Sequence, residues 1–240
     1  MKVQPIRDFS KFVLMQKLLM RDGKVRECLL LQTLYNTNLR IADALRLRWE
    51  MVIDENGAAK DHFNMLELKT GKSAWRPIPN DLQSAFAGFF AKYRPRLADY
   101  VFRSESPKIR FRNVPWHRNH PYKIIKQYAA MAGIKDNVGA HSSRKTWAWH
   151  YYNNGGDLEL LRLEMNHANI RTTLIYAGIE EDQRRKDYEK LSQLNAEGAA
   201  LMSNMPNRTP TYRRRKPPKT AKKKRKKPEK IRRYARRIEL

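Results

Sequence analysis

The chain has 240 residues, of which 41% are apolar, which is enough to bury one sizeable core. Its formal net charge of +26 and a pI near 10.3 point to a polyanionic partner, nucleic acid before a membrane surface. The single cysteine, Cys28, excludes an intramolecular disulfide framework. No apolar run approaches the roughly 20 residues of a membrane span, so we expect a protein that stays inside the cell.

The positive charge is concentrated at the C-terminal end. Residues 206–240 hold 17 Lys and Arg against two Glu, a net charge of +15, which leaves +11 for residues 1–205. A Lys/Arg/Pro-rich segment of this kind cannot bury enough apolar surface to fold alone. We therefore predict one folded domain over 1–200 and a basic, disordered arm over 201–240 that binds nucleic acid.

The first elements along the chain are helices. Apolar residues recur at helical spacing over 9–20 and 25–34, and a third helix is predicted to start near residue 39. In the third helix an apolar stripe comprises Leu39, Ala42, Leu45 and Trp49. This stripe would place Arg40 and Asp43, three residues apart, together on another face of that helix.

Residues 62–79 have the pattern of a β-hairpin, with two short extended segments around Thr70-Gly71. We expect Lys69 to end the first strand and Lys72 to lie in the turn. Helical patterns follow over 81–93, 117–132, 141–153, 157–165 and 180–195. The predicted fold is therefore mainly α with one small antiparallel β-hairpin or sheet.

Four residues in the second half of the chain have a specific spacing. His141 and Arg144 form an H-x-x-R motif, His167 follows Arg144 by 23 residues, and Tyr176 follows His167 by nine. Together with the arginine of "TNLRIADALRLRW" and the lysine of "LELKTGK", this pattern resembles the catalytic domain of tyrosine recombinases, the phage-integrase family. The resemblance covers roughly residues 5–195.

The resemblance implies a role for each residue. Arg40 and Arg144 would bind the phosphate, a task suited to the guanidinium fork. Tyr176 would be the nucleophile that forms a 3′-phosphotyrosyl link. His141 would assist removal of the phenolic proton of Tyr176. His167 would contact the phosphate, and is alternatively a packing residue.

Two further residues complete the implied site. Lys69 would be the general acid that protonates the leaving 5′ oxygen, with Lys72 as the alternative. Asp43 would support the active-site arginines, or alternatively form only a surface ion pair with Arg40 or Arg46.

Two departures from the family pattern concern the backbone. Asn38 stands before Arg40 where the family has glycine, and "MNH" stands where it has Leu-Gly-His. Asparagine tolerates the left-handed conformation better than other non-glycine residues, so we expect Asn38 to adopt it. A third departure is the short stretch ahead of Arg40: we expect no separate N-terminal core-binding domain, and we expect the basic arm to substitute for it by counterion release.

The predicted function is site-specific cleavage and rejoining of double-stranded DNA through a phosphotyrosyl intermediate, with no metal and no cofactor. The alternatives are DNA relaxation of the type IB topoisomerase kind and a non-catalytic DNA-binding regulator that keeps the fold. By resemblance the working unit is a homotetramer on paired DNA sites, with an accessory DNA-bending protein as a further partner. The stripe of Tyr188, Leu191 and Leu194 would dock on a neighbouring subunit. We expect a cytoplasmic, nucleoid-associated protein in a prokaryote or its virus, and a nuclear one in a eukaryotic host.

Overall fold

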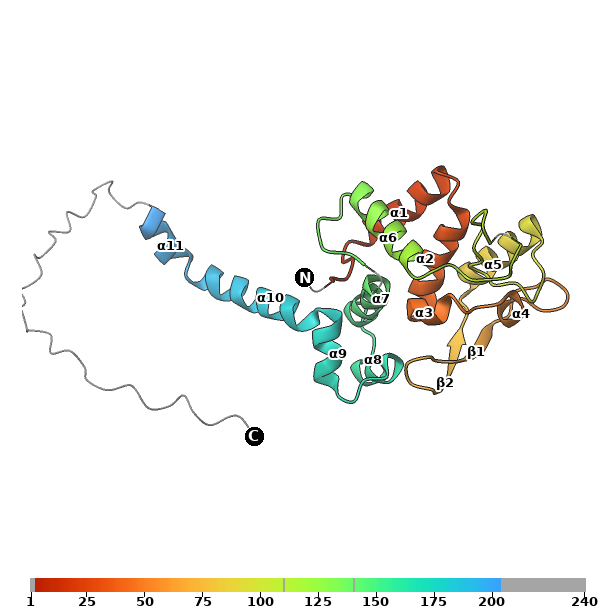
Figure 1. The fold of residues 1–240 in the computed structure, drawn as a ribbon. Coiled ribbons are helices and arrows are strands. Elements are labelled where there is room, and N and C mark those ends of the chain that lie inside the picture. The colour runs from red at the N-terminus through yellow and green to blue at the C-terminus, as the bar shows by residue number, and fades with distance from the viewer. Residues whose placement is uncertain (1–2, 110, 140, 204–240) are drawn as a thin grey trace, which may run out of the picture. The chain divides into compact units, whose positions relative to one another are not determined.

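The computed structural model describes residues 3–203 apart from 110 and 140 (Figure 1). The chain divides into two compact units, Met1–Gln193 and Leu194–Leu240. Of the second unit the described part contains α11 (Ala196–Ser203). The basic arm predicted over 201–240 therefore lies, from residue 204 on, outside the described residues.

Four helices build the larger part of the first unit. They are α1 (Phe9–Arg21), α2 (Val25–Thr37), α5 (Asn80–Tyr93) and α6 (Asn119–Met131). Helix α2 packs against the other three. Its side chains Cys28, Leu30 and Leu34 are almost fully buried, as expected for a helix that is surrounded by other elements. Burial raises the pKa of the Cys28 thiol to about 11, so this cysteine is a core residue.

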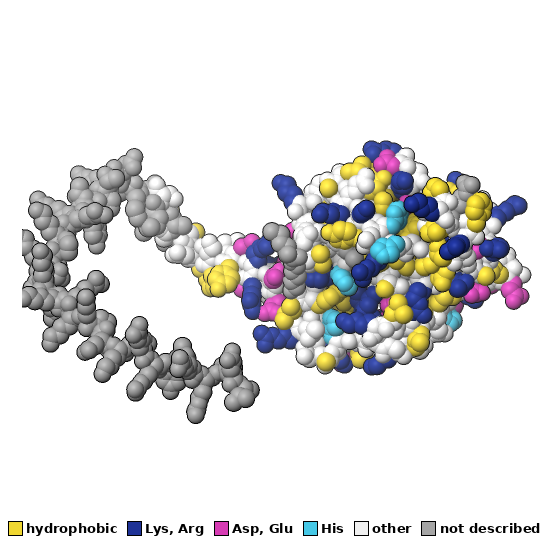
Figure 2. Space-filling view, in the orientation of Figure 1, with side chains coloured by type: hydrophobic (Ala, Val, Ile, Leu, Met, Phe, Trp, Pro, Cys, Tyr) yellow, Lys and Arg dark blue, Asp and Glu magenta, His cyan; other side chains and the backbone are white. Residues whose placement is uncertain are grey.

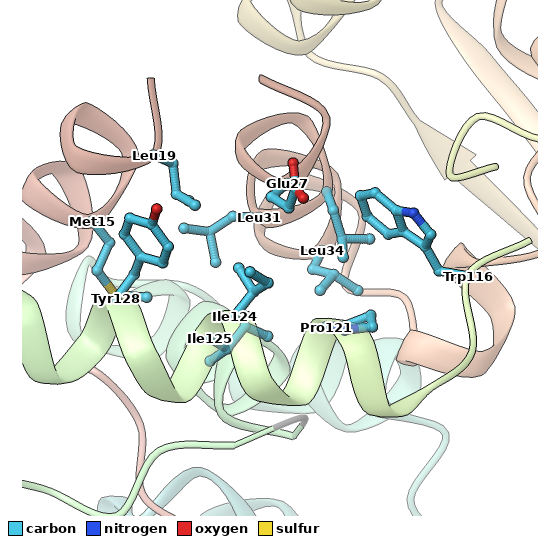
Figure 3. A pocket seen from close by; sticks show the side chains of 11 residues that line it. Met15, Leu19, Glu27, Leu31, Leu34, Trp116, Pro121, Ile124, Ile125 and Tyr128 are labelled. Atoms are coloured by element: carbon cyan, nitrogen blue, oxygen red, sulfur yellow. The ribbon is translucent and has the colours of Figure 1, made fainter. Parts of the chain in front are cut away.

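Helices α1, α2 and α6 leave little empty space between them. Figure 3 shows the pocket among α1, α2 and α6, lined chiefly by apolar side chains such as Met15, Leu31 and Ile125. Its volume is about 10 Å³, which is no more than one water molecule needs. This region is packed core and offers no room for a ligand.

The third helix predicted from the sequence is broken into two single turns, α3 (Ile41–Ala44) and α4 (Trp49–Val52). The prediction of one continuous helix from residue 39 was wrong. Arg40 precedes α3 in extended conformation, and Asp43 is buried. The two side chains therefore do not share an exposed helix face, because Asp43 points into the protein.

The sheet consists of two antiparallel strands, β1 (His62–Leu66) and β2 (Ser73–Pro77), which confirms the predicted hairpin. Its register pairs Phe63 with Arg76 and Leu66 with Ser73. Lys69 was predicted to end the first strand, but it lies in the turn that follows that strand. The turn closes through Gly71, whose φ of +65° suits glycine.

The rest of the first unit is formed by α7 (Ser142–Asn153), α8 (Leu158–Met165), α9 (Ile170–Ala177) and α10 (Ile179–Leu194). Helix α7 lies against α2, α8 and α9, as Figure 1 shows. A second small core around Ala148, Leu161 and Met165 holds them together. Helix α9 lies between residues 165 and 180, where the sequence predicted no helix. Asn169 caps its start by accepting the Thr172 N–H.

Both asparagines that replace the family's glycines have left-handed backbones. Asn38 has a φ of +52° and ends α2, and Asn166 has a φ of +59° and ends α8. This confirms the left-handed conformation expected for Asn38 and shows that Asn166 of "MNH" has the same conformation. A left-handed residue after the last turn is a common way to stop a helix, and here it sets the direction of the last helical carbonyl groups.

Within residues 3–203, leaving aside 110 and 140, no helix combines the length and apolar character that crossing a bilayer requires. The same residues contain no group of three or more His, Cys, Asp and Glu side chains arranged to hold a metal ion.

Candidate active site

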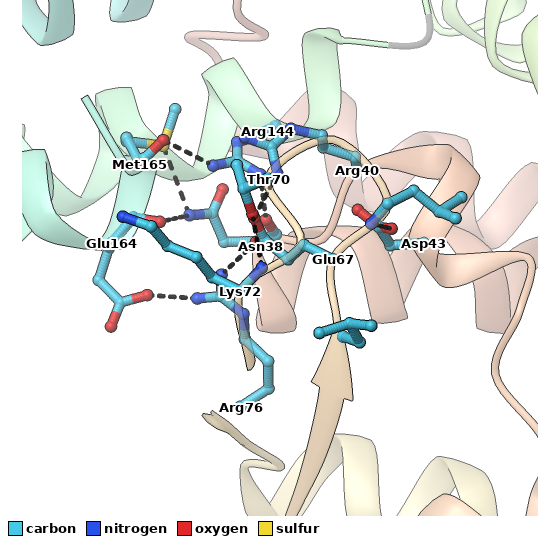
Figure 4. A network of polar contacts seen from close by, with 12 residues as sticks. Asn38, Arg40, Asp43, Glu67, Thr70, Lys72, Arg76, Arg144, Glu164 and Met165 are labelled. Atoms are coloured by element: carbon cyan, nitrogen blue, oxygen red, sulfur yellow. Dashed lines mark hydrogen bonds and ion pairs between the residues drawn. The ribbon is translucent and has the colours of Figure 1, made fainter. Parts of the chain in front are cut away.

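Arg144 is held in place by the ends of two helices. Its Nη1 donates to the Asn38 carbonyl oxygen and its Nη2 to the Met165 carbonyl oxygen, both at 3.1 Å (Figure 4). The side chain is buried, and burial together with the charge of Arg40 lowers its pKa to about 10. Carbonyl groups at helix C-termini stabilise a cation without neutralising it. The guanidinium is therefore charged at neutral pH.

Arg40 is held by a carboxylate instead. Its Nη1 donates to Glu67 Oε2 at 2.7 Å, and Arg76 Nη2 donates to Glu67 Oε1 at 3.0 Å. Arg76 in turn pairs with Glu164, and Thr70 donates its hydroxyl to Glu67 (Figure 4). Burial by itself raises the pKa of the Glu67 carboxyl, but the bonds from Arg40 and Thr70 and the nearby positive charge lower it to about 2.

Asp43 connects α3 to the turn that carries Lys69. Its Oδ1 accepts the Leu68 N–H at 2.9 Å, and the side chain is only 1% exposed. Arg46 approaches the same oxygen at 3.8 Å. Asp43 thus bonds to the backbone directly before Lys69, rather than pairing with Arg40.

Lys69 and Lys72 differ in how they relate to the two histidines. The charge of Lys69 is among those that lower the pKa of His141 and of His167. Lys72 contributes its backbone to the turn, since its carbonyl oxygen accepts the Glu67 N–H at 3.0 Å. This arrangement favours Lys69 as the functional lysine.

The histidines are both kept in the neutral form. His141 immediately precedes α7, and burial followed by the charges of Arg144 and Lys145 lowers its pKa. Burial, followed by the charges of Arg144 and Arg40, also lowers the pKa of His167. The Nδ1 of His167 lies 3.0 Å from the Thr173 hydroxyl. A neutral imidazole can accept a proton, so either ring can serve as a base.

Tyr176 lies on α9 and is half-buried. Its ring packs edge to face with His167, with ring centroids 5.3 Å apart. Burial raises the pKa of its phenol, whereas the charges of Arg144 and Arg40 act in the opposite direction. The hydroxyl is therefore close enough to both arginines to interact with them electrostatically.

The structure brings the six predicted residues into one cluster. They come from the starts of α3 and α7, the hairpin turn and the segment from α8 to α9: Arg40, Lys69, His141, Arg144, His167 and Tyr176. The electrostatic effects of the two arginines and Lys69 on the histidines, and of the arginines on Tyr176, all act within this cluster.

Three residues of the site were not found from the sequence: Glu67, Arg76 and Lys145. Glu67 could have been found, because Phe63 and Met65 alternate inward along β1 and the same alternation turns Glu67 toward the interior. A buried carboxylate needs a cation. Arg76 and Lys145 carry no such signal, because a basic residue in a strand or helix is by default exposed.

The chain belongs to the phage integrase family, whose model matches residues 12–183. Among its relatives is the probable integrase/recombinase YoeC of Bacillus subtilis, 31% identical over 187 residues, which are 78% of this chain and 96% of YoeC. The tyrosine recombinase XerD of Vibrio vulnificus is 28% identical over 68% of this chain. The match covers 52% of XerD, so the chain spans about half the length of that relative.

Solved structures show the same fold. The crystal structure of XerA recombinase matches with a TM-score of 0.59 and 20% identity, over 78% of this chain and 63% of XerA. XerH recombinase bound to its difH substrate matches with a TM-score of 0.58 over 72% of this chain and 48% of XerH. A lambda integrase dimer bound to a core site matches with a TM-score of 0.54 over 74% of this chain and 60% of the integrase. These likenesses confirm the predicted fold class.

The acid stability of the protein tests the Glu67 network. The pKa of Glu67 is about 2 in the folded protein against an ordinary 4.5. The ionised carboxylate therefore contributes fully to the free energy of unfolding above pH 4.5, and this contribution is lost as the pH falls toward 2. We expect Glu67→Gln to lower the free energy of unfolding at neutral pH, and the difference from wild type to shrink across that window. Urea denaturation at a series of pH values measures it.

Glu55→Gln, at an exposed position, is the matched control and should change the free energy of unfolding little at any pH. A Glu67→Gln deficit that stays constant down to pH 2 would contradict the network.

Proposed function

We propose that this protein is a site-specific tyrosine recombinase, which cleaves and rejoins double-stranded DNA through a 3′-phosphotyrosyl intermediate. The observation that carries the proposal is the convergence of Arg40, Arg144 and Lys69 on two neutral histidines and Tyr176. Membership of the phage integrase family supports it. The family match favours recombination over relaxation of supercoils, and the complete set of chemical groups favours catalysis over DNA binding alone.

The proposed cleavage step starts at the Tyr176 oxygen, which attacks the scissile phosphorus. The phenolic proton passes to His141, the new bond joins the tyrosine oxygen to phosphorus, and the bond from phosphorus to the 5′ oxygen breaks. Lys69 donates a proton to that leaving oxygen. The reverse reaction, with the 5′ hydroxyl of a partner strand as nucleophile, rejoins the DNA without an external energy source.

Charge at the phosphate is the main catalytic requirement, because the non-bridging oxygens become more negative in the transition state. We assign Arg40 and Arg144 to these oxygens. Arg144 suits the task because carbonyl groups hold it and leave its charge uncompensated. We assign His167 to the phosphate as well, since it lies beside the tyrosine ring, and Asp43 to support of the Lys69 turn.

The DNA itself is the proposed partner of the basic surface. On the face shown in Figure 2, Lys and Arg side chains are more widespread than acidic ones, and histidines lie among them. Several of the similar structures are DNA complexes by their titles, including those of XerH and lambda integrase. We propose that the basic segment 201–240 adds sequence-independent affinity through counterion release.

We further propose that the working unit is a homotetramer on paired DNA sites. Three apolar side chains of α10 support this: Tyr188, Leu191 and Leu194 are 74%, 61% and 84% exposed. A row of exposed apolar residues on a charged helix is suited to a protein interface. An accessory DNA-bending protein and a nucleoid location in a prokaryotic cell complete the proposal.

The proposed nucleophile is tested by trapping the covalent intermediate. A pool of nicked duplexes with a randomised core acts as suicide substrate, because the short cleaved strand diffuses away and the adduct cannot reverse. We expect wild type to form adducts that resist denaturation, and Tyr176→Phe to form at least about a thousandfold fewer, since no other hydroxyl takes its place. Quantifying the labelled protein–DNA band measures this.

Tyr93→Phe, on α5 outside the cluster, is the control and should trap as much adduct as wild type. Equal trapping by Tyr176→Phe and wild type, or no adduct with wild type, would refute the proposed function.

The assignment of the general acid is tested with a sulfur leaving group. Lys69→Ala should cleave ordinary DNA at least about a hundredfold more slowly than wild type, because an unprotonated 5′ alkoxide is a poor leaving group. A 5′-bridging sulfur leaves without a proton, so the same variant should cleave such DNA at nearly the wild-type rate. Lys72→Ala should behave like wild type on both substrates, and the reverse outcome would assign the role to Lys72.

A further inference from the structure

Lys145 lies against the proposed nucleophile. Its side chain is only 4% exposed, and its Nζ lies 5.1 Å from the centroid of the Tyr176 ring. A buried lysine is unusual, because its ammonium loses hydration that must be replaced by a favourable partner. The face of an aromatic ring is such a partner, since its negative quadrupole attracts a cation.

The position of Lys145 on α7 explains how it reaches the ring. His141, Arg144 and Lys145 have the spacing i, i+3 and i+4, which places them on the same side of a helix. The Lys145 N–H donates to the His141 carbonyl oxygen at 3.1 Å, so the helical turn is already formed at this point. The first turn of α7 therefore carries two cations that act on the same tyrosine of α9, Arg144 through its charge and Lys145 through its contact with the ring, and His141 directly precedes that turn.

The Tyr176 ring has two close neighbours, Lys145 and His167. Lys145 lies over its face, and the imidazole of His167 meets it at an interplanar angle of 68°. Both contacts are made with the aromatic ring and neither is made with the phenolic hydroxyl. The ring can thus be fixed while the oxygen stays available for chemistry.

We propose that Lys145 is a positioning residue, which fixes the ring of Tyr176 by a cation–π contact so that its hydroxyl faces the phosphate held by Arg40 and Arg144. The inference rests on the proposed function. A nucleophile held at the right distance and angle reacts far faster than one that samples several orientations. The ring follows only two side-chain torsions, so one contact on its face restricts both.

Positioning the tyrosine affects the cleavage rate, whereas binding a phosphate affects DNA affinity. A lysine that bonds to the DNA backbone contributes to affinity, so its removal weakens binding and lowers the salt dependence of binding. A lysine that orients the tyrosine contributes to the rate of the bound complex alone. The two roles separate when affinity and single-turnover cleavage are measured on the same DNA.

The experiment compares Lys145→Met and Lys145→Arg in the full-length protein, with a nicked duplex recovered from the wild-type trapping pool. Methionine fills a similar volume without charge, and arginine keeps a cation for the ring. We expect Lys145→Met to form adduct about tenfold more slowly, the size that a desolvated cation–π contact supports, with DNA affinity within about twofold of wild type. Lys145→Arg should restore most of the rate.

Lys17→Met, which removes the same charge from an exposed position on α1, is the control and should leave the rate unchanged. A double-mutant cycle on the free energy of unfolding, with Lys145→Met and Tyr176→Leu, measures the contact without DNA and should show favourable coupling. The inference is overturned if Lys145→Met cleaves at the wild-type rate, if affinity falls by the same factor as the rate, or if the cycle shows no coupling. Wild type that forms no adduct, by contrast, overturns the proposed function itself, while the cycle still decides the contact.

Discussion

The two hydrogen bonds from Arg144 to the carbonyl oxygens of Asn38 and Met165 are the interaction on which the rest of the site depends. They join the ends of α2 and α8 to α7, and so unite helices that belong to different apolar clusters. Each of those helix ends is set by a left-handed asparagine. The backbone conformation at two points in the chain therefore determines where the central guanidinium lies.

The choice of carbonyl groups rather than carboxylates has an electrostatic consequence. A carboxylate partner would stabilise buried Arg144 more strongly, but it would also cancel the charge that a phosphate needs. Arg40, by contrast, is paired with a carboxylate, because it donates to Glu67, which also accepts from Arg76. The cluster as a whole thus keeps an excess of positive charge, and two neutral histidines and a phenol of raised pKa lie within it. A bound phosphodiester would relieve this excess.

The six candidate site residues were predicted from the spacing of the motifs and their resemblance to a known family. The intervals from His141 to Tyr176 pointed to four residues that lie within electrostatic range in the structure, since the charge of Arg144 acts on both histidines and on Tyr176. Arg144 lies in the first turn of α7 and Tyr176 on α9, whereas His141 directly precedes α7 and His167 lies between α8 and α9. The wrong predictions concern short elements. The third helix breaks after Ala44, since the burial of Asp43 and its bond to Leu68 override the local helical pattern. Lys69 lies in the hairpin turn because β1 already ends at Leu66.

The residues that spacing could not reveal are those defined by contact across the fold. Arg76 on β2 meets Glu67, which follows β1, through a side-chain ion pair, and Lys145 meets Tyr176 through the packing of α7 on α9. Nothing in the neighbouring sequence distinguishes either from an exposed basic residue. Their role becomes visible only when the side chains are seen to be buried.

The central claim is that the uncompensated charge of Arg144 acts on the scissile phosphate. It is tested most directly with DNA in which a methylphosphonate replaces that phosphate and removes its negative charge. Arg144→Ala should cleave ordinary DNA at least about a hundredfold more slowly than wild type, the usual cost of losing one oxyanion contact. On the methylphosphonate the account predicts that the same variant falls within about tenfold of wild type. An equal deficit on both substrates would contradict it, and would show that Arg144 supports the fold rather than the phosphate.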